Sequence, residues 1–187
     1  MPGPGGILAL DLARVTGWCY GLPWDDPPAF GTWHMPLQGG EGAKFAAFEN
    51  ELIEAVEGFQ PARILAEAPL PLAAMNNRAS AWQQLGMRAF VRSTAYRHSI
   101  PTGEISADMV RMELLGLSRV PGNPDGIKQH VVLWCRRKGW RVPDHNAGDA
   151  CLLWEWAASR ARGTNRVQHA LPMRGGFHGM GTPAGDD

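Results

Sequence analysis

Short apolar runs and later helical periodicities divide the first part of the chain into strands followed by a helix. Three successive apolar runs, separated by turn residues, predict strands over residues 7–11, 17–21 and 29–35. Over 43–59, apolar residues recur at three- and four-residue steps with glutamates between them, which predicts an amphipathic helix. A fourth apolar run predicts a strand over 62–66.

The second half alternates between the two periods. Helices are predicted over 80–98, 107–115 and 125–138, a fifth strand over 101–105, and a last helix from 145 or 146 to 161. Three strands in succession followed by alternating helices and strands indicate an α/β protein. We therefore expect a five-stranded mixed sheet flanked by helices.

The length and composition favour one domain. At 187 residues the chain is long enough to bury a sizeable core, and we assign residues 1–162 to it. From 163 to 187, Gly, Pro, Arg and His dominate without periodicity, which predicts a flexible tail.

The cysteines and the hydropathy bear on location. Cys19, Cys135 and Cys151 lack metal-ligand spacing and lie in apolar segments, so we expect buried free thiols in a reducing compartment. No stretch approaches the roughly 20 apolar residues of a membrane helix, and the N-terminus resembles no signal peptide. A cytoplasmic protein without membrane contact is expected.

Charge is balanced overall but unevenly distributed. Lys plus Arg and Asp plus Glu both number 18. Residues 1–67 carry three basic and nine acidic side chains, whereas residues 78–141 carry eleven basic and four acidic ones. Such asymmetry suggests an anionic partner for the middle of the chain, and ordinary solvated helix faces are the alternative.

Two predicted core strands lead into acids, Asp11 and Glu67, and a third acid, Asp149, opens the last helix three residues after Asn146. If the first and fourth strands are neighbours, Asp11 and Glu67 meet at one edge of the sheet. A cluster of carboxylate and amide oxygens suits Mg²⁺ or Mn²⁺. Two such ions, about 3.5–4 Å apart, support phosphodiester cleavage.

Each acid also has a purely structural interpretation. Asp11 could accept hydrogen bonds from the turn at 13–14, and Glu67 could be a surface acid at a strand end. Asp149 could merely favour the positive end of the helix dipole. The joint placement of the three acids argues for the metal site.

The ordered motifs resemble a known family. They are a strand ending in Leu10-Asp11, then Thr16-Gly17-Trp18, then Ala66-Glu67, and finally Asp149-Ala150. Over about residues 6 to 160, this set resembles the RuvC-like Holliday junction resolvases of the ribonuclease H superfamily, especially the phage-type crossover junction endodeoxyribonucleases.

The resemblance implies a ribonuclease H-like fold and a homodimer that cuts two opposed strands of a four-way DNA junction, leaving 5′-phosphates. It implies two Mg²⁺ ions, replaceable by Mn²⁺, on Asp11, Glu67 and Asp149. The fourth catalytic position, usually Asp or His, is Asn146 here. His145 and Asp144 are the alternatives for this ligand.

Several residues are expected to meet DNA or the second subunit. The DNA contacts expected first are Asn76, Asn77, Arg78, Ser80, Arg111 and Lys128, and further basic candidates are Arg88, Arg92 and Arg119. Leu70, Leu72 or Met75 could open the junction as an apolar wedge, or form a core or dimer contact. By resemblance, the helix at 80–98, with Trp82 and Leu85, forms the dimer interface; burial against the sheet is the alternative.

The expected function is metal-dependent resolution of branched DNA in the cytoplasm of a bacterial or phage-infected cell. One alternative is a ribonuclease H-like nuclease acting on RNA–DNA hybrids or flaps. Another is a junction-binding protein that does not cut. The neutral Asn146 at the fourth catalytic position supports this alternative. A sugar-kinase-like fold is discounted, because it requires a second glycine-rich phosphate loop and usually about twice this length.

Overall fold

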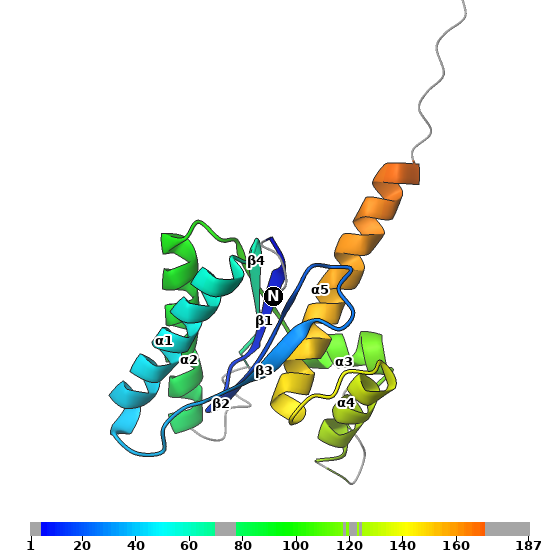
Figure 1. Cartoon of the computed structure of the whole chain (residues 1–187). Helices are drawn as coiled ribbons and strands as arrows, with labels where there is room; N and C mark the ends of the chain where they lie inside the picture. Colours follow the sequence, from blue (N-terminus) through cyan, green and yellow to red (C-terminus); the bar gives the residue numbers. More distant parts are fainter. Residues whose placement is uncertain (1–4, 70–77, 118, 120–122, 124, 171–187) are drawn as a thin grey trace, which may run out of the picture.

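The computed structural model describes residues 5–69, 78–117, 119, 123 and 125–170. Its strands form one sheet of order β3-β2-β1-β4-β5 (Figure 1). The strands are β1 (Ile7–Asp11), β2 (Val15–Gly21), β3 (Ala29–His34), β4 (Arg63–Glu67) and β5 (Thr102–Ile105). The pairs β1–β2 and β2–β3 are antiparallel, while β1–β4 and β4–β5 are parallel, so the predicted five-stranded mixed sheet is confirmed.

The helices cover both faces of this sheet. They are α1 (Gly40–Phe59), α2 (Arg78–Arg97), α3 (Ala107–Leu115), α4 (Gly126–Arg137) and α5 (His145–Ala170). Figure 1 shows α1 and α2 on one side, and α3, α4 and α5 on the other. The predicted flanking helices are therefore present, with shifts of a few residues at several ends.

The two faces of β1 build two separate cores. Ile7 and Ala9 pack into the core beneath α4 and α5, whereas Leu8 and Leu10 pack into the core beneath α1 and α2. This follows from the alternation of side chains along a strand. Because β1 is central and covered on both sides, its sequence is a continuous apolar run that ends only at Asp11.

The last helix is longer than predicted. It reaches Ala170 instead of ending near Ala161, because the single Gly163 costs only about 1 kcal/mol of helix propensity and the residues around it do not break a helix. The predicted domain boundary at 162 and the flexible tail stay predictions, and residues 171–187 lie outside the described part of the chain. The helix α2 starts at Arg78, two residues before its predicted start.

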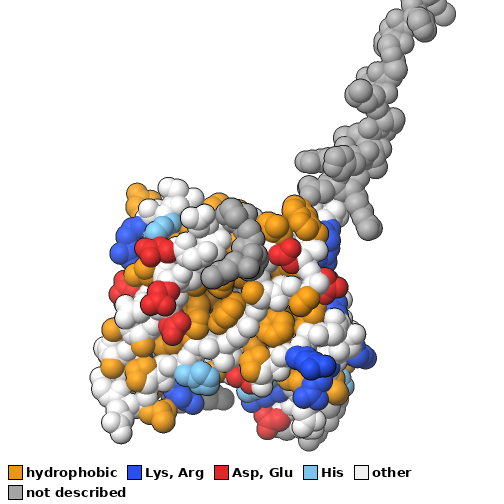
Figure 2. All heavy atoms as spheres, in the orientation of Figure 1, with side chains coloured by type: hydrophobic (Ala, Val, Ile, Leu, Met, Phe, Trp, Pro, Cys, Tyr) orange, Lys and Arg blue, Asp and Glu red, His pale blue; other side chains and the backbone are white. Residues whose placement is uncertain are grey.

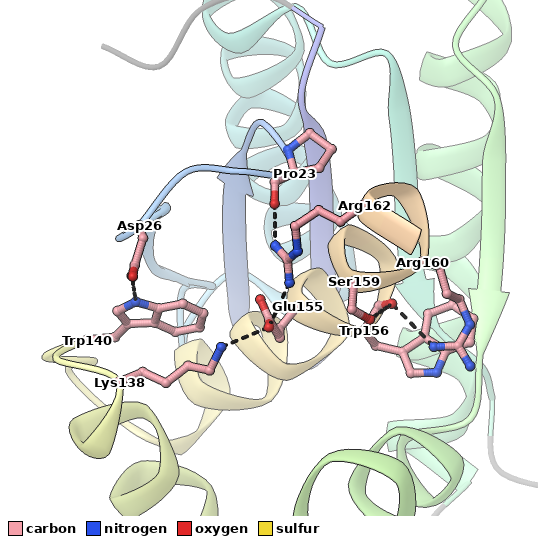
Figure 3. A network of polar contacts seen from close by, with 9 residues as sticks. All are labelled: Pro23, Asp26, Lys138, Trp140, Glu155, Trp156, Ser159, Arg160 and Arg162. Atoms are coloured by element: carbon pink, nitrogen blue, oxygen red, sulfur yellow. Dashed lines mark hydrogen bonds and ion pairs between the residues drawn. The ribbon is translucent and has the colours of Figure 1, made fainter. Parts of the chain in front are cut away.

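A buried carboxylate fixes α5 to two other parts of the chain (Figure 3). Glu155 accepts a hydrogen bond from Lys138 Nζ at 2.8 Å and another from Arg162 Nη2 at 2.8 Å. Arg162 also donates to the carbonyl oxygen of Pro23 in the β2–β3 loop. The β2–β3 loop and the end of α4 are thereby tied to α5, on which Asp149 lies.

Two further predictions concern the cysteines and membrane-spanning helices. Cys19, Cys135 and Cys151 are free and buried, as predicted. Within the described ranges, no helix is both long and apolar enough to cross a membrane.

Candidate metal and nucleic-acid site

Asp11 and Glu67 lie side by side because of the strand register. In the parallel pair β1–β4, Leu10 lies opposite Ala66, and each acid is the next residue along its strand. The carboxyl ends of parallel neighbours meet at the same sheet edge. The predicted adjacency of the two acids is confirmed.

The Thr16-Gly17 pair brings the start of α5 to this edge. Thr16 donates its hydroxyl hydrogen to the carbonyl oxygen of Ala13 at 2.7 Å, which closes the β1–β2 turn. Gly17 lies opposite Asp11, and a Cβ atom at Gly17 would collide with the carbonyl oxygen of Asn146. Only glycine therefore allows the first turn of α5 to pack this closely against β2.

Asp11 is in a strongly acidic environment. It is 9% exposed, and its carboxyl group shares a hydrogen bond with that of Glu67. Burial is the largest cause that raises the pKa of Asp11 well above its usual value, followed by the charge of Glu67 and, more weakly, that of Asp149. Hydrogen bonds from backbone N–H groups of the turn would instead lower this pKa, so the structural interpretation of Asp11 is disfavoured.

Asp149 faces an arginine from α3. Burial raises the pKa of Asp149, although Arg111 partly offsets this. Arg111 donates to Asp149 Oδ1 from Nη2 at 2.8 Å and from Nε at 3.2 Å. Burial alone would lower the pKa of Arg111, but Asp149, Glu67 and Asp11 raise it. Arg111, predicted as a DNA contact, thus lies within the carboxylate cluster.

The donor chemistry of the cluster suits a hard divalent cation. In the part of the chain that the structure describes, no three His, Cys, Asp or Glu side chains form a ready metal-binding group. Asp149 is paired with Arg111, and Asp11 is hydrogen-bonded to Glu67. Three neighbouring carboxylates nevertheless need positive charge to be ionised together, and oxygen donors are the ligands that Mg²⁺ and Mn²⁺ prefer. The predicted ligand set has the donor chemistry that these ions require. Metal binding itself stays a prediction.

The three possibilities for the fourth ligand differ in their contacts. Asp144 Oδ1 accepts a hydrogen bond from the backbone N–H of Ala147 at 3.0 Å, so it caps α5. His145 is near enough for its positive charge to lower the pKa of Asp149. Asn146 is partly buried, one helical turn before Asp149. Because the cap already uses one carboxylate oxygen of Asp144, Asn146 or His145 is favoured as the fourth metal ligand.

Arg88 is buried behind the end of β4. Its side chain is only 6% exposed, so its prediction as a phosphate contact is wrong. Arg88 Nη2 donates to the backbone carbonyl oxygen of Glu67 at 2.5 Å, and Nη1 donates to that of Gln84 at 3.3 Å. Its burial could have been predicted from its spacing, because it lies one residue after Met87 and three before Val91, both on the inward face of α2.

The other predicted DNA contacts are only partly described. Asn76, Asn77 and the possible wedge residues Leu70, Leu72 and Met75 lie outside the described residues, and the side chains of Arg78 and Ser80 are not described. Lys128 is on α4, half-exposed, and 2.9 Å from Asp125 Oδ1.

The outward side of α2 carries large apolar side chains. Trp82 is 62% exposed and Leu85 is 44% exposed. Another face of α2, with Met87 and Val91, is buried in the core beneath the sheet, as the alternative expected, but Trp82 and Leu85 do not take part in it. Their place in a dimer interface stays a prediction.

The sheet order, its flanking helices and the acids at its edge define a ribonuclease H-like fold. Among solved structures, the chain is similar to Thermus thermophilus RuvC in complex with a Holliday junction substrate, with a TM-score of 0.66 and 12% identity over 84% of this chain and 95% of that one. A second Thermus thermophilus RuvC structure gives a TM-score of 0.61 and 16% identity, over 85% of this chain and 97% of that one. The chain thus has the RuvC-like fold that the sequence motifs predicted.

A more distant structure shares the fold. The yeast mitochondrial Holliday junction resolvase gives a TM-score of 0.50 and 14% identity, over 90% of this chain and 86% of that one. No family model and no curated protein matches the sequence. At identities this low, the likeness is one of fold.

Proposed function

We propose that this protein is a metal-dependent, structure-selective DNA endonuclease that resolves four-way junctions and other branched DNA by paired phosphodiester cleavage. The observation that carries the proposal is that Asp11 and Glu67 end adjacent parallel strands, while Glu67, Asp149 and Arg111 line one small pocket. The fold neighbours support the substrate, since one contains a Holliday junction and another is named as a Holliday junction resolvase.

Asp11, Glu67 and Asp149 would hold two Mg²⁺ ions, or Mn²⁺, with Asn146 completing the ligand set. Bound there, the ions would activate a water molecule and stabilise the leaving oxygen of an in-line displacement. Asp11 and Glu67 are held at adjacent strand ends, and Asp149 is held one turn into α5. Burial strengthens the interactions of these carboxylates with any bound cation.

Arg111 and Lys128 would bind and orient the substrate. Arg111 Nη2 is 2.8 Å from Asp149 Oδ1, so a phosphate at the carboxylates would also be within reach of this guanidinium. Lys128 is half-exposed near the start of α4 and would contact a phosphate farther along the strand. The anionic partner suggested by the sequence would thus be the DNA backbone.

Cutting two opposed strands requires two sites, so we propose a homodimer. The exposed Trp82 and Leu85 on α2 supply an apolar surface of the kind that dimer interfaces use. Light scattering after size exclusion should give twice the chain mass for the natural protein and a reduced mass for Trp82→Ala with Leu85→Ala. A monomeric natural protein would contradict the dimer.

Substrate competition tests the proposed function. A labelled four-way junction, a linear duplex and an RNA–DNA hybrid of the same sequence are compared for binding and cleavage in Mg²⁺ or Mn²⁺. We expect cleavage of the junction in the presence of excess duplex. Preferred cleavage of the hybrid would instead support the ribonuclease H-like alternative.

A junction-binding protein that does not cut is the second candidate. It is favoured by the neutral amide of Asn146 and by the pairing of Asp149 with Arg111. Tight junction binding without nicks in either metal would support it. In that case Asn146→Asp, which adds a fourth carboxylate, should restore cleavage.

A further inference from the structure

A groove beside the carboxylate cluster combines basic and apolar side chains. It lies between α4 and the start of α5 and has a volume of about 460 Å³. Its lining includes Lys128, Val132, Leu133, Arg136, Asp144 and His145. Figure 2 shows Lys and Arg side chains gathered at the lower right of the molecule, in the region of α4.

The groove is continuous with the site. His145 lines the groove and directly precedes Asn146, one turn before Asp149. A DNA strand whose scissile phosphate lies at the carboxylates would therefore continue into this groove.

The charge of the groove favours an anionic strand. Lys128 and Arg136 both line it, eight residues apart on α4, which is about 12 Å along a helix. No carboxylate of the described residues lies within ion-pair distance of Arg136. The groove acid Asp144 is engaged in capping α5. Lys128 pairs with Asp125 at 2.9 Å, but both side chains are about half exposed or more, and such surface pairs contribute only about 0–1 kcal/mol. A phosphate can therefore replace Asp125 at Lys128.

The apolar part of the groove distinguishes an unpaired nucleotide from a duplex. Leu133 is 51% exposed, and Val132 beside it is partly exposed. In a duplex the base faces are stacked on one another, so only an unstacked base can cover these side chains. Proteins that bind single strands combine a basic groove with side chains on which bases pack, and apolar side chains also contact unstacked bases.

We infer that the α4–α5 groove binds an unstacked nucleotide of branched DNA next to the scissile phosphate. Lys128 and Arg136 hold its phosphates, and Leu133 packs against its base. This inference rests on the proposed function and adds a subsite to it.

The test uses a four-way junction with 2-aminopurine at the branch point, bound without divalent metal so that no strand is cut. The groove variants are Leu133→Ala and Arg136→Gln. Their controls are Leu37→Ala, an exposed leucine in the β3–α1 connection outside the groove, and Arg137→Gln, the exposed neighbour that does not line the groove. All four positions are exposed, so thermal unfolding should match that of the natural protein.

We expect the natural protein and both controls to raise 2-aminopurine fluorescence on binding, and Leu133→Ala to lose most of this rise. Loss of one base-packing contact should weaken junction binding by roughly 5-fold or more. Arg136→Gln should reduce the slope of log affinity against log salt by about 1. Binding of linear duplex should be affected less.

Two results would overturn the inference while leaving the proposed function intact. One is unchanged fluorescence and salt dependence in both groove variants of a protein that still binds and cuts junctions. The other is an equal loss of affinity for linear duplex, which would mean that paired DNA occupies the groove. Failure of the natural protein to prefer the junction would instead overturn the proposed function itself.

Discussion

At the scale of single residues, the site is a group of carboxylates that lowers the stability of the metal-free protein. Asp11 and Asp149 are 9% and 7% exposed, and burial is the largest cause that raises the pKa of each. A carboxyl group whose pKa is raised by folding costs stability once it ionises. Such an arrangement is expected where function, rather than folding, determines the residue.

Replacing Asp11 by Asn should therefore stabilise the protein when no metal is present. Below the usual carboxyl pKa of about 3.8, the natural protein carries no penalty, because Asp11 is protonated whether folded or unfolded. The penalty grows as the pH rises from 3.8 through the raised pKa and remains above it. In EDTA, the melting temperature of Asp11→Asn should exceed that of the natural protein by more at pH 8 than at pH 5, about 2–4 °C per kcal/mol.

The control for this measurement is Glu57→Gln, which removes an exposed carboxylate from α1. Its melting temperature should follow that of the natural protein at both pH values. A lower melting temperature for Asp11→Asn at pH 8 would mean that Asp11 has a supporting partner, contrary to its acidic environment.

Arg88 stabilises the end of β4 by donating a hydrogen bond to the backbone carbonyl oxygen of Glu67. Burial lowers the pKa of its guanidinium, and Glu104 and Glu67 partly offset this cost. Arg88→Met should lower the free energy of unfolding by about 2 kcal/mol, since hydrogen bonds from charged groups contribute about 1.5–3 kcal/mol. It should also weaken Mn²⁺ binding measured by calorimetry, because the Glu67 carbonyl loses its donor.

Arg92→Met is the matched control. Arg92 also lies on α2 and also pairs with Glu104, at 3.0 Å, but its side chain is 67% exposed. Such surface pairs contribute about 0–1 kcal/mol. If Arg88→Met kept natural Mn²⁺ affinity while losing stability, Arg88 would be a structural residue only.

At the scale of elements, the site depends on how closely α5 approaches β2. Gly17→Ala would place a methyl group against the Asn146 carbonyl and force the start of α5 away from the sheet edge. We expect a loss of about 1–3 kcal/mol, as for other overpacked sites, together with weaker Mn²⁺ binding because Asp149 moves with α5. Denaturant unfolding and calorimetry measure the two effects.

Gly58→Ala is the control for backbone substitution. Gly58 lies in α1, and a Cβ atom there would meet nothing within 4 Å. It should be neutral or stabilise the protein by about 0.4–1 kcal/mol, because alanine reduces the entropy of the unfolded chain. A neutral Gly17→Ala would contradict the close packing of α5 on β2.

The sequence was informative where local pattern determines structure. The acids at the ends of β1 and β4 could be predicted because each ends an apolar run, and the parallel pairing of two such runs brings their ends together. The spacing along α2 indicates that Arg88 lies on the inward face, but it identifies no partner for Arg88 or for Arg111. Whether a helical arginine reaches a carboxylate or a phosphate depends on the packing of α2 and α3 against the sheet, which the spacing of apolar residues does not specify.

At the scale of the whole molecule, the two sides of the sheet have different proposed tasks. The side of α1 and α2 carries the exposed Trp82 and Leu85 and is proposed to meet a second subunit. The side of α3, α4 and α5 carries Arg111, Asp149 and the basic groove and is proposed to meet DNA. The carboxylates lie at the sheet edge, so each subunit of a dimer would bring one complete site to a branched substrate.

The central claim is that the carboxylates at this edge cut both strands of a junction. The most direct test compares nicks in a labelled mobile four-way junction, with Mg²⁺ or Mn²⁺, for the natural protein, Asp11→Asn and the control Glu57→Gln. We predict paired, symmetric, metal-dependent nicks from the natural protein and the control. Asp11→Asn should reduce them by at least about 100-fold, since removing a group that merely orients a metal ligand already costs about 10–100-fold. Undiminished nicking by Asp11→Asn would contradict the account.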